Sequence, residues 1–184
     1  MVLITLVVGA LLVGAIITFI VLGVTNAVPW LFLIAIAATI VFTRKREKEQ
    51  FVSWKDEYSV GIEMIDDDHR KLLNLINQFQ TAVFYQTGKQ FEDEAFEALI
   101  EYTQTHFERE EQLMSEHGYP DFEAHQAEHR KMVDLVEARM AEYRQQGRHE
   151  AMEEMVVYLR DWLIKHINGT DQAYSGFLHE KGVR

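Results

Sequence analysis

The charged residues of this chain are confined to one part of it. Residues 1–43 contain no Asp, Glu, Lys or Arg, and the chain's 29 acidic and 18 basic residues all follow that segment. Ionised side chains are almost never fully buried without partners, so the uncharged segment suits an apolar environment and the remainder suits water. The sequence therefore predicts two physically different parts that join near residue 44.

The uncharged segment holds two apolar runs. Val2–Val24 has 23 mostly apolar residues, which at about 1.5 Å per residue can cross a hydrocarbon core of about 30 Å. Ala27–Thr43 has 17 residues, near the lower limit for a span. Asn26 and Pro29 supply turn and helix-start signals at the junction. We expect a two-helix transmembrane hairpin over residues 1–43, with both ends on one side of the bilayer.

The residues after the hairpin indicate its orientation. Arg44–Lys48 carries four positive charges in five residues, a pattern typical of the cytoplasmic side of a span. A cleaved signal peptide is the alternative interpretation, but the first nine residues lack the basic start that such peptides usually have, so we favour a retained anchor. Residues 44–50 are then a basic juxtamembrane linker, and residues 51–184 are a soluble domain that faces the cytoplasm.

The composition excludes several classes of protein. The chain has no cysteine, so disulfides, thiolate zinc sites and iron–sulfur clusters on cysteine ligands are excluded. Its net charge is −11 and the soluble part shows no basic face, which argues against nucleic acid as a partner. There is no P-loop, dinucleotide fingerprint or nucleophile elbow. Any metal must be held by histidines and carboxylates.

Four stretches of the soluble part repeat apolar residues at alternating spacings of three and four. They cover about residues 65–85, 91–117, 122–145 and 149–167, and glycines separate them. Such a spacing puts one apolar stripe on each helix, and short connections favour antiparallel neighbours. We predict an all-α fold, an up-down-up-down four-helix bundle preceded by the transmembrane hairpin. Residues 50–62 lack this period and are expected to form an arm along the bundle.

Polar residues interrupt the inward-facing stripes. Five of the eight histidines and one glutamate fall there: His69, His106, Glu110, His125, His129 and His166. One buried histidine is commonly a hydrogen-bonded core residue, but five spread over four helices are hard to satisfy in that way. A metal would compensate them, because residues four apart on a helix can present two ligands to one centre. Neutral imidazoles suit iron, zinc, copper or nickel, so the pattern leaves the metal open.

Two carboxylates are candidates for a bridge between two metals. Glu110 lies on a stripe, whereas Asp171 follows His166 by five residues, about 140° around a regular helix. Because Asn168 and Gly169 lie between them, we predict a local helix distortion that turns Asp171 toward the centre. The Glu-x-x-His motifs of ferritin-like sites are absent, since no inward histidine has a glutamate three residues before it.

These residues resemble the hemerythrins, most closely the bacteriohemerythrins. The matching stretches are "YSVGIEMIDDDH", "HFEREEQLM", "HQAEH" and "WLIKHINGTDQAY", and the resemblance covers about Trp54–Leu178. It implies two iron ions joined by an oxo or hydroxo bridge. One iron would be held by His125, His129 and His166, the other by His69 and His106, and Glu110 and Asp171 would bridge them. Dioxygen would bind at the open position of the two-histidine iron.

The resemblance also suggests roles for residues beside the ligands. Four apolar residues match the family's oxygen pocket: Phe107, Trp162, Leu163 and Ile167. Plain core packing is the alternative for each of them. Tyr174 matches a family position near the bridging carboxylate.

The function that the resemblance implies is reversible dioxygen binding, for oxygen storage or delivery at the membrane, and not an enzymatic reaction. Sensing of oxygen or redox state, redox chemistry on nitric oxide or peroxide, and a structural role as a tethered oligomer stay open, because the same ligands serve all of them. The expected partners are dioxygen, the lipid bilayer, a membrane oxidase or oxygenase, and further copies of the chain through the hairpin. The expected location is the bacterial inner membrane.

Overall fold

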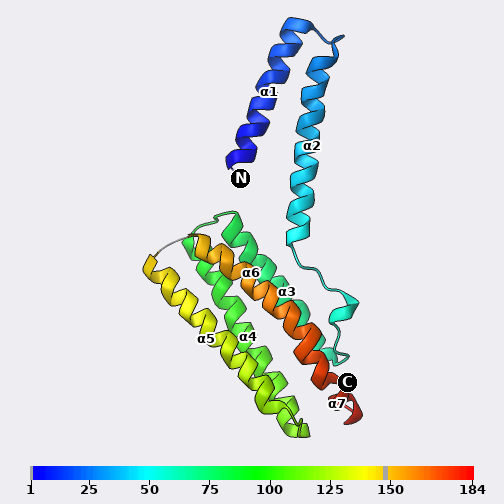
Figure 1. Cartoon of the computed structure of the whole chain (residues 1–184), viewed down its shortest axis with the longest axis vertical. Helices are drawn as coiled ribbons and strands as arrows, with labels where there is room; N and C mark the ends of the chain where they lie inside the picture. The colour runs from blue at the N-terminus through cyan, green and yellow to red at the C-terminus, as the bar shows by residue number, and fades with distance from the viewer. Residues whose placement is uncertain (1, 147–148) are drawn as a thin grey trace. The chain divides into compact units, whose positions relative to one another are not determined.

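The computed structural model describes residues 2–146 and 149–184. The chain forms two compact units, one that ends at Phe51 and one that covers Val52–Arg184, and each is described by itself. The described residues are helical apart from short connections and one extended arm, which confirms the predicted all-α class (Figure 1).

The first unit is an antiparallel helical hairpin of α1 (Val2–Leu22) and α2 (Ala27–Gln50) (Figure 1). Asn26 caps α2, since its side chain accepts a hydrogen bond from the Val28 N–H at 3.0 Å. Gly14 lets the helices approach closely, because a Cβ there would lie 2.7 Å from the ring of Phe32. The hairpin predicted from the two apolar runs is therefore present as a packed pair of helices.

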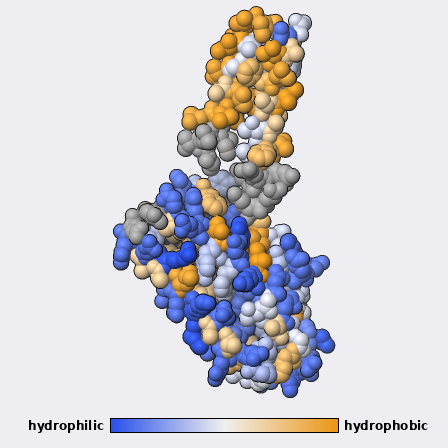
Figure 2. Space-filling model, in the orientation of Figure 1, coloured by the Kyte–Doolittle hydropathy of each residue, from blue (hydrophilic) through white to orange (hydrophobic). Residues whose placement is uncertain are grey.

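The surface of this hairpin is strongly apolar, as Figure 2 shows. Within the described residues, Thr5–Leu22 is the one stretch that is long and apolar enough to cross a membrane, by length and composition. The apolar part of α2, Ala27–Thr43, is shorter. Residues 44–50, expected as a linker, continue α2 as a helix. Lys, Arg, Glu and Gln are strong helix formers, and no glycine or proline interrupts them.

The second unit contains the predicted four-helix bundle. Its helices are α3 (Glu63–Phe84), α4 (Lys89–His117), α5 (Phe122–Gln146) and α6 (His149–His166). Helix α4 packs on α3, α5 on α4 and α6 on α5, and α6 also packs on α3, so the bundle closes with antiparallel neighbours (Figure 1). After α6 the chain makes a π-helical turn, Ile167–Asp171, and ends in α7 (Gln172–Glu180). That turn confirms the distortion predicted from Asn168 and Gly169.

The arm before α3 is extended except for one 3₁₀ turn, Asp56–Tyr58. Asn77 of α3 holds its start: the Val52 N–H donates to the Asn77 Oδ1 at 2.9 Å, and the Asn77 amide donates to the Val52 carbonyl at 2.7 Å. Asp66 holds its end, because its carboxylate accepts from the Ser59 hydroxyl at 2.5 Å and from the Val60 N–H at 2.7 Å. The arm is therefore fastened to α3 at two points.

The connection between α4 and α5 sets two ligand-bearing helices side by side. Gly118 ends α4 in the left-handed conformation, with φ 70° and ψ 44°. The following Tyr119 N–H donates to the Met114 carbonyl at 2.9 Å, which is the bond of a Schellman motif. This tight ending lets α5 begin at Phe122 and return along α4.

The core consists of two apolar clusters separated by buried polar residues. The larger cluster runs through the bundle and includes Leu72 and Phe79; the smaller one, near the α4–α5 turn, includes Ile65 and Met114. On α3, His69 lies between Ile65 of the smaller cluster and Leu72 of the larger one. A polar layer sandwiched between apolar clusters is shielded from water, so its charges must be compensated within it.

Candidate metal centre

The polar layer contains all seven residues that the sequence suggested as ligands. They are His69 from α3, His106 and Glu110 from α4, His125 and His129 from α5, His166 at the end of α6, and Asp171 at the end of the π-helical turn. None of them exposes more than 4% of its surface. The helices therefore bring together side chains that lie up to about a hundred residues apart in the sequence.

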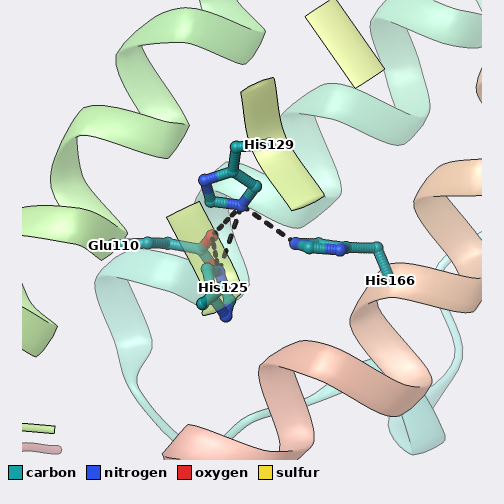
Figure 3. Close-up of side chains that lie close together, drawn as sticks. All are labelled: Glu110, His125, His129 and His166. Carbon is teal, nitrogen blue, oxygen red and sulfur yellow. Dashed lines mark hydrogen bonds and ion pairs between the residues drawn. The ribbon is translucent and has the colours of Figure 1, made fainter. Parts of the chain in front are cut away.

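One group of ligand atoms belongs to three histidines and Glu110 (Figure 3). The Nε2 atom of His129 lies 3.1 Å from the Nε2 of His125 and 3.0 Å from the Nε2 of His166. The same atom lies 3.3 Å from the Glu110 Oε2. Three imidazole nitrogens that converge on one point cannot all be satisfied by hydrogen bonds to each other, whereas one cation would satisfy all three.

A second group belongs to His69, His106, Glu110 and Asp171. The Nε2 of His69 lies 3.3 Å from the Asp171 Oδ2, and the Nε2 of His106 lies 3.5 Å from the Glu110 Oε1. Both Nε2 atoms and both oxygens of Asp171 are buried without a hydrogen-bond partner. Buried polar atoms are normally paired, so this donor set fits a metal ion that would pair them.

Glu110 and Asp171 link the two groups. Glu110 directs Oε2 toward His125 and His129 and Oε1 toward His106. Asp171 directs Oδ1 toward His166 at 3.1 Å and Oδ2 toward His69 at 3.3 Å. Each carboxylate thus offers one oxygen to each group. The π-helical turn makes this arrangement possible, because a regular helix would carry Asp171 well away from the face of His166.

The surroundings keep both carboxylates charged. Burial raises the pKa of Glu110, but the neighbouring His106, His125 and His129 outweigh it, so the pKa lies well below its usual range. Burial and the nearby Glu110 raise the pKa of Asp171, but His166 and His69 lower it by more. The net effect is a pKa below the usual value of an aspartate. Carboxylate oxygens and imidazole nitrogens together form ligand sets that hold non-haem iron.

Tyr174, which the sequence placed near the bridging carboxylate, contacts it directly. Its hydroxyl donates to the Glu110 Oε1 at 2.5 Å, and the side chain is fully buried in α7. Burial, Glu110 and Asp171 together raise the pKa of Tyr174 well above its usual value. The phenol therefore stays neutral and acts as a hydrogen-bond donor.

The four residues suggested as an oxygen pocket lie against the histidines of the first group and the core beside them. The ring of Phe107 stacks on His129 with centroids 3.6 Å apart, and Trp162 stacks on His166 at 4.3 Å. Leu163 and Ile167 are buried in the larger apolar cluster. Trp162 and His166 also line a groove of about 630 Å³ between α5 and α6. Phe107 and Trp162 therefore cover histidines of the first group, whereas Leu163 and Ile167 are shown only as part of the apolar core.

Sequence reasoning missed two carboxylates that face the outer nitrogens of the histidines. The Glu111 Oε1 lies 3.0 Å from the Nδ1 of His129, and the Asp68 Oδ2 lies 3.6 Å from the Nδ1 of His106. Each lies next to a ligand in the sequence, about 100° away from the inward stripe. The spacing of the inward-facing residues therefore does not predict Asp68 and Glu111 as part of the site. Their positions next to His69 and Glu110 in the sequence are the one signal that could have identified them.

Comparisons with known proteins identify the family to which the second unit is similar. The model of the family described as hemerythrin HHE cation binding domain matches residues 60–178. The bacteriohemerythrin of Stenotrophomonas maltophilia is 36% identical over 126 residues, which cover 66% of this chain and 78% of that protein. The bacteriohemerythrin of Methylococcus capsulatus is 33% identical over 119 residues, which cover 64% of this chain and 88% of that protein.

A solved structure has the same fold. The crystal structure of a wild-type hemerythrin aligns with a TM-score of 0.59 and 29% identity, and the alignment covers 69% of this chain and 97% of that one. The matched residues 60–178 include every candidate ligand described above. The chain belongs to the hemerythrin family.

Proposed function

We propose that the polar layer holds two iron ions and that the protein binds dioxygen reversibly there. The observation that carries this proposal is the placement of Glu110 and Asp171, each of which offers one oxygen to each histidine group. Carboxylates that span two ligand groups suit a pair of metal ions about 3.5–4 Å apart. Membership of the hemerythrin family favours iron over the other metals that imidazole accepts.

The two groups would hold the two ions unequally. His125, His129 and His166 would hold one ion, His69 and His106 the other, and Glu110 and Asp171 would be shared. A pair of ferrous ions supplies the two electrons that reversible dioxygen binding needs. Because the second group has one histidine fewer, the place for a small molecule would lie on the side of His69 and His106.

The protein's own residues would shield and hold the whole polar layer, with both of its ligand groups. Phe107, Leu163 and Ile167 are buried apolar side chains that keep water from the layer. Tyr174 holds the Glu110 carboxylate in one orientation through its hydrogen bond. A dry and rigid site slows the entry of protons, which favours release of the bound gas over its consumption.

We also infer that the hairpin anchors this domain to a membrane, with the basic residues 44–48 on the cytoplasmic side. The length of Thr5–Leu22 and the exposure of apolar side chains such as Ile20 and Leu31 support this. An anchored domain would store oxygen at the bilayer or deliver it to a membrane oxidase or oxygenase, and the hairpin would be the contact in a homo-oligomer. Recovery of the full chain in the alkaline-washed membrane fraction would support the anchor, and recovery in the supernatant would contradict it.

The test of the oxygen function is an optical titration of the full chain in detergent, together with its iron content. We expect two irons per chain, a colourless reduced form, and bands in the near-ultraviolet and visible that appear with oxygen and vanish when it is removed. A reduced form that passes irreversibly to a stable oxidised spectrum would instead favour redox chemistry or sensing. A wild-type chain without iron-dependent bands would refute the proposal.

A further inference from the structure

Asp68 connects the candidate metal centre to the surface of the bundle. It lies on α3 directly before His69, and its surface is 2% exposed. Its Oδ1 accepts two hydrogen bonds from α4, one from the Tyr102 hydroxyl and one from the Arg109 guanidinium, each at 2.5 Å. A buried carboxylate next to a ligand is therefore tied to a cation on the neighbouring helix.

The second oxygen of Asp68 faces a ligand histidine. Its Oδ2 lies 3.6 Å from the Nδ1 of His106, and both atoms are buried with no hydrogen-bond partner among the described residues. The Nε2 of the same ring faces the Glu110 Oε1 at 3.5 Å. A proton on Nδ1 that points at Asp68 would leave the Nε2 lone pair free for the centre, and it would fix the orientation of the ring.

The other histidine group has a differently compensated carboxylate. The Glu111 Oε1 lies 3.0 Å from the Nδ1 of His129, and its Oε2 accepts a hydrogen bond from the neutral amide of Gln126 at 2.7 Å. Among the described residues, no Lys or Arg side chain pairs with Glu111. Asp68, by contrast, forms an ion pair with Arg109, which partly neutralises its negative charge. The two groups thus have outer carboxylates of unequal effective charge.

We propose that Asp68 is a positioning residue that polarises His106, and that Arg109 and Tyr102 limit this polarisation by drawing the carboxylate's charge toward themselves. This inference rests on the proposed di-iron function. A more negative Asp68 makes the His106 imidazole a stronger electron donor, which stabilises the oxidised metal; the Arg109 cation acts in the opposite sense. Asp68 and Arg109 together therefore set the midpoint potential of the metal on the side of His69 and His106, where the small molecule would bind.

This arrangement predicts opposite effects for the two partners. Asp68→Asn removes the negative charge, so His106 donates less and the midpoint potential rises. Arg109→Gln removes the opposing cation, so the potential falls, and Tyr102→Phe lowers it by less. Replacement of an outer partner of a metal-bound histidine typically costs 10–100-fold in metal affinity or activity. By analogy we expect a change of about tenfold in the reduction equilibrium for Asp68→Asn and for Arg109→Gln.

The experiment measures the midpoint potential of the full, iron-loaded chain in detergent for each variant. Arg109→Lys is the rescue variant, because it keeps a cation near Asp68 and should stay close to the wild type. Arg70→Gln is the matched control, since Arg70 pairs with Asp67 at 2.8 Å on the solvent side of α3. The side chain of Arg109 is 39% exposed, so its replacement should leave the fold intact, as a thermal unfolding curve would show.

The outcomes separate this inference from the proposed function. Opposite shifts for Asp68→Asn and Arg109→Gln, with rescue by Arg109→Lys, support it. Shifts in the same direction, or none, in chains that still bind iron overturn it and leave the function intact. A wild-type chain that binds no iron overturns both. If Asp68→Asn does not fold, the comparison of Arg109→Gln with Arg109→Lys decides the question.

Discussion

The hydroxyl of Tyr174 donates to the Oε1 of Glu110 across 2.5 Å, and neither side chain has any exposed surface. The bond joins α7 to α4 and therefore ties the end of the chain to the middle of the candidate metal centre. Its donor is neutral and its acceptor is charged, since burial raises the pKa of Tyr174 and the surrounding histidines hold that of Glu110 low. Such bonds are stronger than those between two neutral groups.

Tyr174→Phe should lower the free energy of unfolding by about 1–3 kcal/mol, because it leaves a buried carboxylate oxygen without its donor. Chemical denaturation of the full chain measures this. Tyr119→Phe is the control, because Tyr119 packs edge-on against Tyr174 and its hydroxyl has no hydrogen bond among the described residues. Equal stability of the two variants would show that the Tyr174 bond does not matter.

Replacement of a candidate ligand should remove iron, whereas replacement of a histidine outside the layer should not. His129→Ala deletes the nitrogen that lies nearest to three other ligand atoms, so the affinity for iron should fall by more than the roughly 10–100-fold that loss of an outer partner costs. His117→Ala should keep the wild-type iron content, because the one hydrogen bond of His117 within the described part of the chain is to the Leu113 carbonyl at the end of α4. Metal analysis of both purified chains gives the answer, and equal iron contents would exclude His129 as a ligand.

Two glycine substitutions should change stability in opposite directions. Gly118→Ala places a side chain in the left-handed conformation that ends α4, at a cost of about 1–2 kcal/mol. Gly176→Ala lies inside α7, where a Cβ meets no atom within 4 Å, and should add about 1 kcal/mol through helix propensity. Thermal or urea unfolding measures both. A stabilising Gly118→Ala would mean that the turn between α4 and α5 is not built as described.

Asn77→Ala should release the start of the arm, since it removes both hydrogen bonds to Val52. The expected loss is about 1–3 kcal/mol of local stability, seen as faster amide exchange from Val52 to Tyr58. Asn74→Ala, one turn earlier on the exposed side of α3, should leave that exchange unchanged. If exchange in the arm is the same in both variants, other contacts hold it in place.

Sequence alone was sufficient for the helices and for the choice of inward residues. The apolar stripes predicted the four bundle helices because the helical period puts residues three and four apart on one face, whatever the neighbouring helix is. The same rule placed His69, His106, His125 and His129 in the core. Asn168 and Gly169 predicted the distortion before Asp171 because these residue types weaken a helix locally.

The tertiary structure decided what surrounds those residues. Asp68 and Glu111 lie off the inward stripes, and they reach the outer nitrogens of His106 and His129 only because adjacent helices present those rings at that rotation. The division of the Glu110 oxygens between two groups depends on side chains from α3, α4 and α5 together. Periodicity describes one helix at a time, whereas these contacts depend on how several helices are turned toward one another.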